Sequence, residues 1–203
     1  RALETSGARE QTLLAFTSDN GVLLGEHGLW RKEVAYEEAM RVPLLLRHPA
    51  ELSPGLRRSQ LVLNVDLPAT LLARAEGAAP AGVDGRDLYA LASPGAAPLT
   101  PPWREDFLYL APYPAGGRPA LLALRGERWK YVRHVTERVE EELFDLAEDP
   151  GERRNQAGSA AQAATLAECR EALTRALDAQ QLPRAWLEAG ARRRSSHKQP
   201  HSR

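Results

Sequence analysis

Residues 13–21 of this chain are Leu-Leu-Ala-Phe-Thr-Ser-Asp-Asn-Gly, an apolar run that predicts a β-strand and ends in an acid and an amide. In open α/β sheets, ligands bind at the carboxyl ends of strands, and Asp19 lies just past such an end. Asp19 and Asn20 offer a carboxylate and an amide oxygen, hard ligands that suit Ca²⁺ or Mg²⁺. The same residues also form an ordinary turn after a strand, so this pattern by itself leaves both interpretations open.

A glycine-containing loop and a lysine follow this strand. Residues 25–32 are Gly-Glu-His-Gly-Leu-Trp-Arg-Lys, which places Lys32 thirteen positions after Asp19. Residues 36–43, Tyr-Glu-Glu-Ala-Met-Arg-Val-Pro, come next. A strand, oxygen ligands, a glycine-containing loop and a lysine together indicate a site for a metal ion and an anionic ester.

This order of motifs resembles the metal- and anion-binding segment of the sulfatase family, within the alkaline-phosphatase-like superfamily. The resemblance continues in family order over about residues 10–157. It includes four further stretches: Asn-Val-Asp-Leu-Pro at 64–68, Gly-Val-Asp-Gly-Arg-Asp-Leu at 82–88, a hairpin at 124–131, and Glu-Leu-Phe-Asp-Leu at 142–146 with Glu-Asp-Pro-Gly-Glu at 148–152.

The resemblance implies a role for several residues. Asp19 and Asn20 match the second pair of metal ligands, normally for Ca²⁺, with Mg²⁺ possible. Lys32 matches the lysine that contacts the sulfate group, where its charge offsets the charge that develops as the ester bond breaks. For His27 two readings stay open: a hydrogen bond to the substrate, or support of the loop. The implied substrate is a sulfated small molecule or saccharide.

Three nearby side chains have structural interpretations. Glu37 and Arg41 lie four positions apart in a predicted helix, so we expect them to pair with each other. Trp30 lies in the loop before Lys32, and we expect it to pack in the core rather than line a pocket.

The nucleophile of this family does not match any residue of the chain. Sulfatases of this type use a formylglycine made from Cys or Ser in a Cys/Ser-x-Pro-x-Arg segment. Cys169 lies in Glu-Cys-Arg-Glu-Ala, and Ser53 has its proline one place too early. The family's first pair of metal-binding aspartates is also unmatched. We therefore expect residues 1–203 to be the C-terminal part of a sulfatase, inactive alone, with the formylglycine supplied from upstream.

Two other functions remain open. One is a phosphonate or phosphate ester hydrolase of the same superfamily, since such esters are similar in shape to sulfate esters. The other is a non-catalytic, truncated sulfatase-like chain.

The expected fold class is α/β, with a small antiparallel sheet after the main domain. Residues 1–92 are expected to be the C-terminal part of the catalytic α/β domain, and 93–104 a Pro/Ala/Gly linker. Residues 105–182 are expected to form the small sheet packed with a C-terminal helix, and 183–203 a disordered basic tail. The loop at 111–119 is a candidate for substrate specificity.

The pattern of the chain also predicts individual elements. A first strand is expected at 12–17 and a buried second strand at 42–47, with a short helix at 33–40 between them. Asp66 is predicted to cap a helix that ends near residue 75, with Leu67, Leu71 and Leu72 sharing one apolar face. Ser159 and Gln162 form a capping-box pattern that begins a helix ending near residue 181. Its apolar stripe is Leu166, Cys169, Leu173 and Leu177. The short strands are expected at 106–111, 120–125, 129–133 and 142–146.

Composition limits the remaining possibilities. Lys+Arg and Asp+Glu are both 27, but the tail 192–203 holds five of the basic residues and no acid. The rest of the chain has 22 basic against 27 acidic residues, a charge of −5, which argues against nucleic-acid binding. The sequence contains no membrane-spanning run, and one cysteine permits no internal disulfide. The oligomeric state and the localisation (periplasmic, secreted, lysosomal or cytoplasmic) stay open.

Overall fold

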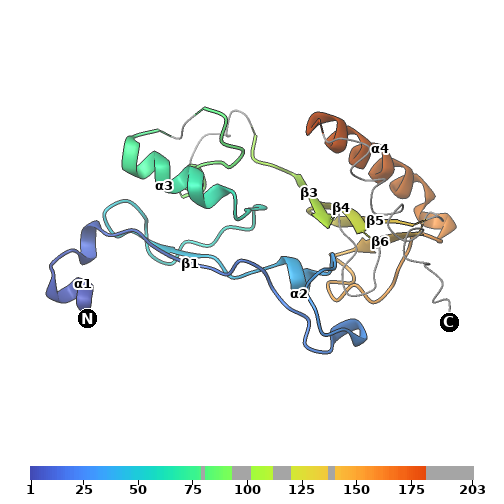
Figure 1. The fold of residues 1–203 in the computed structure, drawn as a ribbon, viewed down its shortest axis with the longest axis horizontal. Helices are drawn as coiled ribbons and strands as arrows, with labels where there is room; N and C mark the ends of the chain where they lie inside the picture. The colour runs from blue at the N-terminus through green and yellow to red at the C-terminus, as the bar shows by residue number, and fades with distance from the viewer. Residues whose placement is uncertain (79–80, 93–101, 112–119, 137–139, 182–203) are drawn as a thin grey trace, which may run out of the picture. The chain divides into compact units, whose positions relative to one another are not determined.

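The computed structural model describes residues 1–78, 81–92, 102–111, 120–136 and 140–181 (Figure 1). The chain divides into two compact units: residues 1–19 with 42–105, and residues 20–41 with 106–203. Most of the predicted linker 93–104, nearly all of the 111–119 loop and the tail 183–203 lie outside the described residues. The predicted boundaries therefore stay predictions, while residues 20–41 group with the C-terminal sheet.

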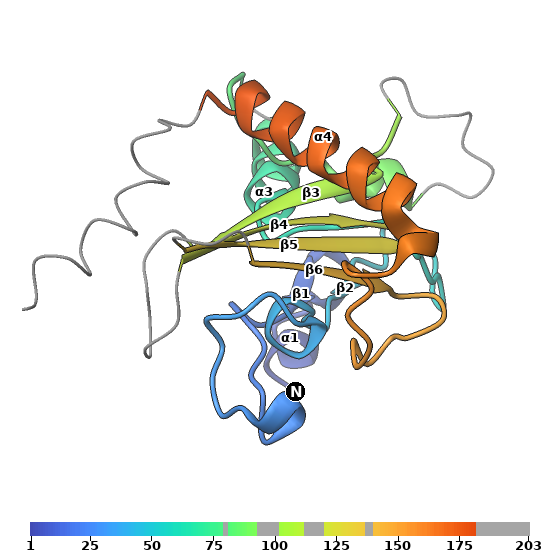
Figure 2. The ribbon, with the colours of Figure 1, turned by 90° about the vertical axis from the view of Figure 1, so that its right-hand side faces the viewer.

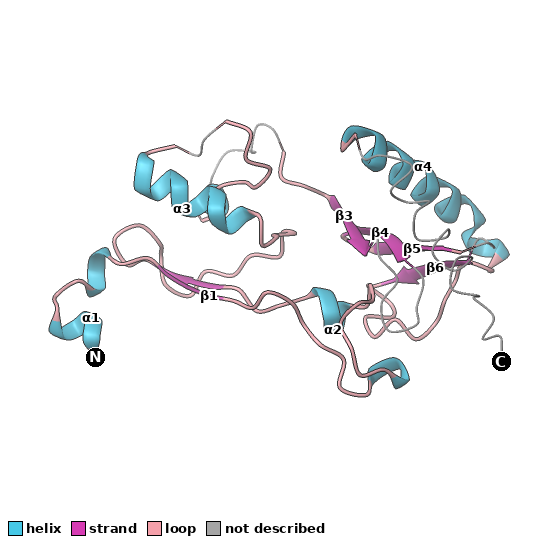
Figure 3. Cartoon of the chain, in the orientation of Figure 1, coloured by secondary structure: helices cyan, strands magenta, loops and turns pink. Residues whose placement is uncertain are grey.

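The first unit contains a two-stranded antiparallel ribbon and a helix (Figure 3). In the ribbon, β1 (Leu14–Phe16) pairs with β2 (Leu45–Arg47). The prediction of a buried second strand was wrong, because Leu45 is 59% exposed and Phe16 on the partner strand is 64% exposed. The shorter elements of this unit are α1 (Ala2–Thr5) and the 3₁₀ turns Arg9–Gln11 and Leu88–Leu91.

Helix α3 (Asp66–Glu76) ends at Gly77, which has φ of 84° as expected for a left-handed C-terminal residue. The prediction that Asp66 caps this helix was wrong. Asp66 is its first helical residue, and its carboxylate binds Arg104 instead. Leu71, one of the leucines of the predicted apolar face, is 48% exposed. The buried residues of the helix are Asp66, Ala69, Thr70 and Ala73.

The second unit is built on a four-stranded antiparallel sheet in which each strand pairs with the next. Its strands are β3 (Asp106–Ala111), β4 (Ala120–Gly126), β5 (Trp129–Val135) and β6 (Glu140–Asp145). All four strands were predicted within two residues of their observed ends, and so was the tight connection between β4 and β5. Helix α4 (Ala163–Ala179) lies across one face of the sheet (Figure 2).

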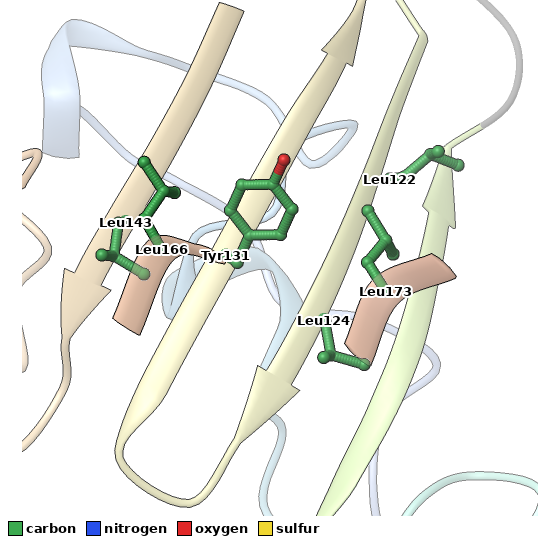
Figure 4. Close-up of a cluster of buried hydrophobic side chains, with 6 residues drawn as sticks. All are labelled: Leu122, Leu124, Tyr131, Leu143, Leu166 and Leu173. Carbon is green, nitrogen blue, oxygen red and sulfur yellow. The ribbon is translucent and has the colours of Figure 1, made fainter. Parts of the chain in front are cut away.

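The main core lies between this sheet and α4 (Figure 4). Leu166 and Leu173 of α4 are buried, and Cys169 and Leu177 pack against the same cluster, as the predicted stripe requires. Burial raises the pKa of the Cys169 thiol, which fits an inert structural cysteine. The capping box was not found. Ser159 precedes the 3₁₀ turn Ala160–Gln162 and makes no side-chain capping bond. The strand residues of the cluster are Leu122, Leu124, Tyr131 and Leu143.

The opposite face of the sheet packs against residues 20–41. Because side chains alternate along a strand, Leu121 and Ala123 of β4 point away from α4, and with Val132 they contact Ala35. Helix α2 (Glu37–Met40) follows Ala35 and is only half as long as the predicted helix at 33–40. Within the described residues, no helix of either unit is long and apolar enough to cross a bilayer.

Candidate metal and anion site

Asp19 is the last residue of the first segment of its unit, three positions after β1 ends. Its side chain is exposed, and Ser18 Oγ donates to its Oδ1 at 3.4 Å. The backbone here is held by Asn64, whose Nδ2 donates to the carbonyl oxygens of Asp19 at 3.0 Å and Ser18 at 3.4 Å. The Asn-Val-Asp-Leu-Pro motif at 64–68 did not predict this role for Asn64. Its amide, two residues before a helix, was the available signal.

Asn20 and Lys32 meet within the other unit. Lys32 Nζ donates to Asn20 Oδ1 at 2.9 Å, although twelve positions separate the two residues. Asn20 Nδ2 donates to the carbonyl oxygen of Gly21 at 2.9 Å, which orients the amide so that its oxygen faces the lysine. The structure therefore brings together one predicted metal ligand and the predicted anion-binding lysine.

The donor set of Asp19 and Asn20 fits a hard cation in type but not in number. Ca²⁺ takes about six to eight oxygen ligands, and these two side chains offer three oxygens at most. Among the described residues no group of three or more His, Cys, Asp and Glu side chains could hold a metal ion. A metal bound here would need further ligands from outside this part of the chain.

Helix α2 holds the backbone beside Asn20. Gly21 N–H donates to the carbonyl oxygen of Ala39 at 2.9 Å. A Cβ atom at Gly21 would lie 2.0 Å from the carbonyl oxygen of Glu38, so only glycine allows this close approach. The position of the Asn20 amide thus depends directly on the position of α2.

His27 lies inside the loop between Asn20 and Lys32. Its ring stacks on Tyr36 with centroids 3.8 Å apart and planes 5° apart, and its Nε2 is 3.7 Å from Glu38 Oε2. The side chain is 14% exposed, and its backbone has φ of 53°, which is uncommon outside glycine. Trp30 in the same loop is 75% exposed, so the expectation that it packs in the core was wrong.

Glu37 has different partners from the one predicted. Its Oε1 lies 2.7 Å from Lys130 Nζ and its Oε2 lies 3.2 Å from Arg125. The predicted pair with Arg41 was wrong because α2 ends at Met40, so Arg41 is no longer on the helix. Burial raises the pKa of Glu37, but Lys130 and Arg125 together outweigh it and leave the pKa lowered.

Comparison with known proteins assigns the family. Residues 25–180 match the family described as N-sulphoglucosamine sulphohydrolase, C-terminal. The chain belongs to the sulfatase family. An N-acetylglucosamine-6-O-sulfatase of Bacteroides thetaiotaomicron is 33% identical over 161 residues, which are 78% of this chain and 28% of that protein.

Two solved structures show that the fold is shared. A protein in complex with its substrate D-glucosamine-2-N,6-O-disulfate gives a TM-score of 0.76 at 30% identity, covering 87% of this chain and 36% of that one. The phosphonate monoester hydrolase of Agrobacterium radiobacter gives 0.72 at 28% identity, covering 89% and 38%. The predicted fold class is confirmed, and the chain spans about a third of the length of these relatives.

Proposed function

We propose that residues 1–203 are the C-terminal part of a sulfatase that hydrolyses a sulfate ester with the help of a divalent metal ion. The contact between Lys32 Nζ and Asn20 Oδ1 carries this proposal, because it brings the predicted anion-binding lysine next to a predicted metal ligand. Membership of the sulfatase family supports the ester type. The relative whose substrate is a glucosamine disulfate supports a sulfated saccharide as the substrate class.

Each proposed site residue has one role. Asp19 and Asn20 would hold the metal, with Ca²⁺ favoured and Mg²⁺ as the alternative, through their side-chain oxygens. The metal, when bound, acts as a Lewis acid toward the sulfate oxygens. Lys32 places a positive charge beside the same oxygens, where it stabilises the charge that grows as the S–O bond breaks.

For His27 the stacking on Tyr36 favours support of the loop. A hydrogen bond from His27 to the substrate remains the alternative. Substitution by Gln, which keeps a polar side chain but loses the stacked ring, separates the two. Loss of loop support would raise amide hydrogen exchange across 20–41, whereas loss of a substrate contact alone would raise KM.

The attacking group has to come from another part of the protein, because the chain contains no Cys/Ser-x-Pro-x-Arg segment. We therefore propose that a formylglycine, with the remaining metal ligands, is contributed by sequence N-terminal to residues 1–203. The 203-residue chain alone should then show no sulfatase activity and only weak Ca²⁺ binding.

The test compares the whole protein that contains these residues with its Lys32→Ala variant on 4-nitrophenyl sulfate. The variant should lose roughly 10²–10³-fold in kcat, the effect of removing one preorganised stabilising group. Arg57→Ala removes another exposed cation from a loop and serves as the control, which should retain activity. Chelation by EDTA should abolish activity and added Ca²⁺ should restore it. Enzyme-like turnover by residues 1–203 alone would contradict the proposal.

A phosphonate or phosphate ester hydrolase is the second candidate. The similarity to the phosphonate monoester hydrolase of Agrobacterium radiobacter favours it specifically. Parallel assays of the whole protein with 4-nitrophenyl sulfate and 4-nitrophenyl phenylphosphonate decide between the two by the ratio of their kcat/KM values.

A further inference from the structure

Lys130 lies on β5 beside Val132, on the face of the sheet turned away from α4. Its side chain is fully buried. Burying a charge is costly unless it is paired and hydrogen-bonded, so a buried lysine needs a specific set of partners. Lysine has three N–H donors to satisfy.

Three oxygens surround the ammonium group of Lys130, two of them from carboxylates that pair with its charge. Nζ lies 2.7 Å from Glu37 Oε1, 2.8 Å from Glu152 Oε1 and 2.9 Å from the carbonyl oxygen of Ala35. Two of these oxygens belong to residues 35–37, which lead into α2. The remaining oxygen, Glu152 Oε1, belongs to the turn after β6. A single ammonium group therefore joins the central strand, the C-terminal turn and the start of α2.

Glu152 closes this arrangement from the other side. Its Oε2 accepts the backbone N–H of Glu37 at 2.6 Å, and its side chain is fully buried. Its backbone has φ of 50°, a conformation that a non-glycine residue keeps only where its surroundings require it. The turn is held by Asp149, which accepts the N–H groups of Glu152 through its carbonyl and of Arg154 through its carboxylate. We call Lys130, Glu37 and Glu152 the buried ion cluster.

The charges on the sheet require this geometry. Arg125 of β4 stands directly opposite Lys130 in the strand register, and two like charges in that position repel each other. The Glu37 carboxylate offsets this repulsion by contacting both, one oxygen toward each cation. If Lys130 were removed, Glu37 would keep only Arg125 as an ion-pair partner. Glu152 would then be buried without a counter-ion.

A continuous set of contacts links the cluster to the site. Glu37 starts α2, and the Ala39 carbonyl of α2 accepts the N–H of Gly21 at 2.9 Å. Gly21 follows Asn20, whose amide oxygen contacts Lys32. Apolar contacts also hold this segment: Leu23, Val34 and Ala39 form a buried cluster of their own, and Ala35 packs against the sheet.

We propose that Lys130 is a positioning residue for the candidate site: through Glu37 and Glu152 it fixes α2, and α2 fixes the backbone that carries Asn20 and faces Lys32. Lys130 touches neither metal nor substrate and acts through the helix. The link to catalysis rests on the proposed function, whereas the link between Lys130 and residues 20–41 does not.

The experiment uses Lys130→Met in the whole protein, because methionine keeps an unbranched chain but removes the charge and the donors. Arg170→Met is the matched control. It removes a cation from the α4 side of the same unit, where Arg170 pairs with Glu141. Glu152→Gln is the milder second variant, which keeps the shape and an acceptor oxygen if Lys130→Met fails to fold.

Two readouts separate the two claims. Amide hydrogen exchange of peptides covering 20–41 should rise at least tenfold in Lys130→Met, and by a smaller factor in Glu152→Gln, but not in Arg170→Met. The Ca²⁺ concentration for half-maximal activity should rise at least tenfold in the same two cluster variants only. Unchanged exchange at 20–41 would overturn the proposal even if the protein proved to have no sulfatase activity. Raised exchange with an unchanged Ca²⁺ requirement in an active enzyme would overturn the positioning of the site.

Discussion

Asp66→Asn should destabilise the first unit severely, because the Asp66 carboxylate is surrounded only by donors. Leu63 N–H donates to Oδ2 at 2.7 Å and Arg86 N–H to Oδ1 at 2.8 Å. Arg104 adds two charged bonds, NH1 to Oδ2 at 2.5 Å and NH2 to Oδ1 at 2.6 Å. Each carboxylate oxygen accepts from two of these four donors. An asparagine has one oxygen and one NH₂, so in either orientation two of the four donors would face the NH₂ group.

The size of the effect follows from burial. Asp66 is 0% exposed and the Arg104 side chain 10%, so the substitution leaves a buried guanidinium without its counter-ion. Breaking such a pair costs about 3–5 kcal/mol, a large share of a typical unfolding free energy of roughly 5–15 kcal/mol. The control is Glu51→Gln, which removes a partly exposed partner of Arg74 and should cost below about 1 kcal/mol.

The assay is urea unfolding of the whole protein, with hydrogen exchange of peptides spanning 61–70 as the local probe. Asp66→Asn should lower the transition midpoint and deprotect these peptides together. Equal stabilities of Asp66→Asn and Glu51→Gln would refute the claim that this carboxylate is an obligatory acceptor.

Two further predictions concern the second unit. Gly21→Ala should raise the Ca²⁺ concentration for half-maximal activity and destabilise the protein by about 1–3 kcal/mol, because its Cβ would lie 2.0 Å from the Glu38 carbonyl oxygen. Gly158→Ala is the control, since its Cβ would meet nothing within 4 Å. Equal melting temperatures and Ca²⁺ requirements of the two variants would contradict this prediction. Burial above all, with repulsion from Glu37, raises the pKa of Glu152 above its ordinary 4.5, so the folded state keeps this proton at pH values where the unfolded state has lost it. The contribution of Glu152 to the free energy of unfolding should therefore fall as the pH rises above about 4.5. Urea midpoints measured from pH 4 to 8 should show this fall relative to Glu152→Gln, and parallel curves would disprove it.

The C-terminal sheet could be predicted from the sequence because its order is local. Strands β3 to β6 pair in chain order, and short β-prone runs separated by turn residues are enough to locate them. The stripe of α4 was equally readable from its spacing. These predictions need no knowledge of which distant residues meet.

Long-range pairing could not be predicted in the same way. Lys130 and Glu37 are 93 positions apart, and no spacing rule connects them. The local rule favoured Arg41 for Glu37, but it assumes a helix long enough to bring residue i+4 onto the same face. Aspartate is a residue type that often caps helices, which is why Asp66 was predicted to do so. Its carboxylate oxygens instead accept hydrogen bonds from Arg104 and from the Arg86 N–H. A lysine at an inward-facing strand position was the one available signal for the buried ion cluster.

A buried charged group bonded to the backbone lies near each of the two predicted metal ligands. These ligands are neighbours in sequence but belong to different units. In the first unit Asp66 binds the backbone N–H beside Asn64, and Asn64 holds the Asp19 carbonyl. In the second, Lys130 and Glu152 bind the backbone at Ala35 and Glu37. Apolar contacts resist compression but tolerate sliding, whereas a buried ion with backbone partners is satisfied in only one arrangement. Replacing such an ion by apolar residues often leaves stability unchanged or raises it, so stability alone gives little reason to keep one. The proposed metal-binding role of Asp19 and Asn20 would give another reason, because each ligand then needs the backbone of its own unit held in one position.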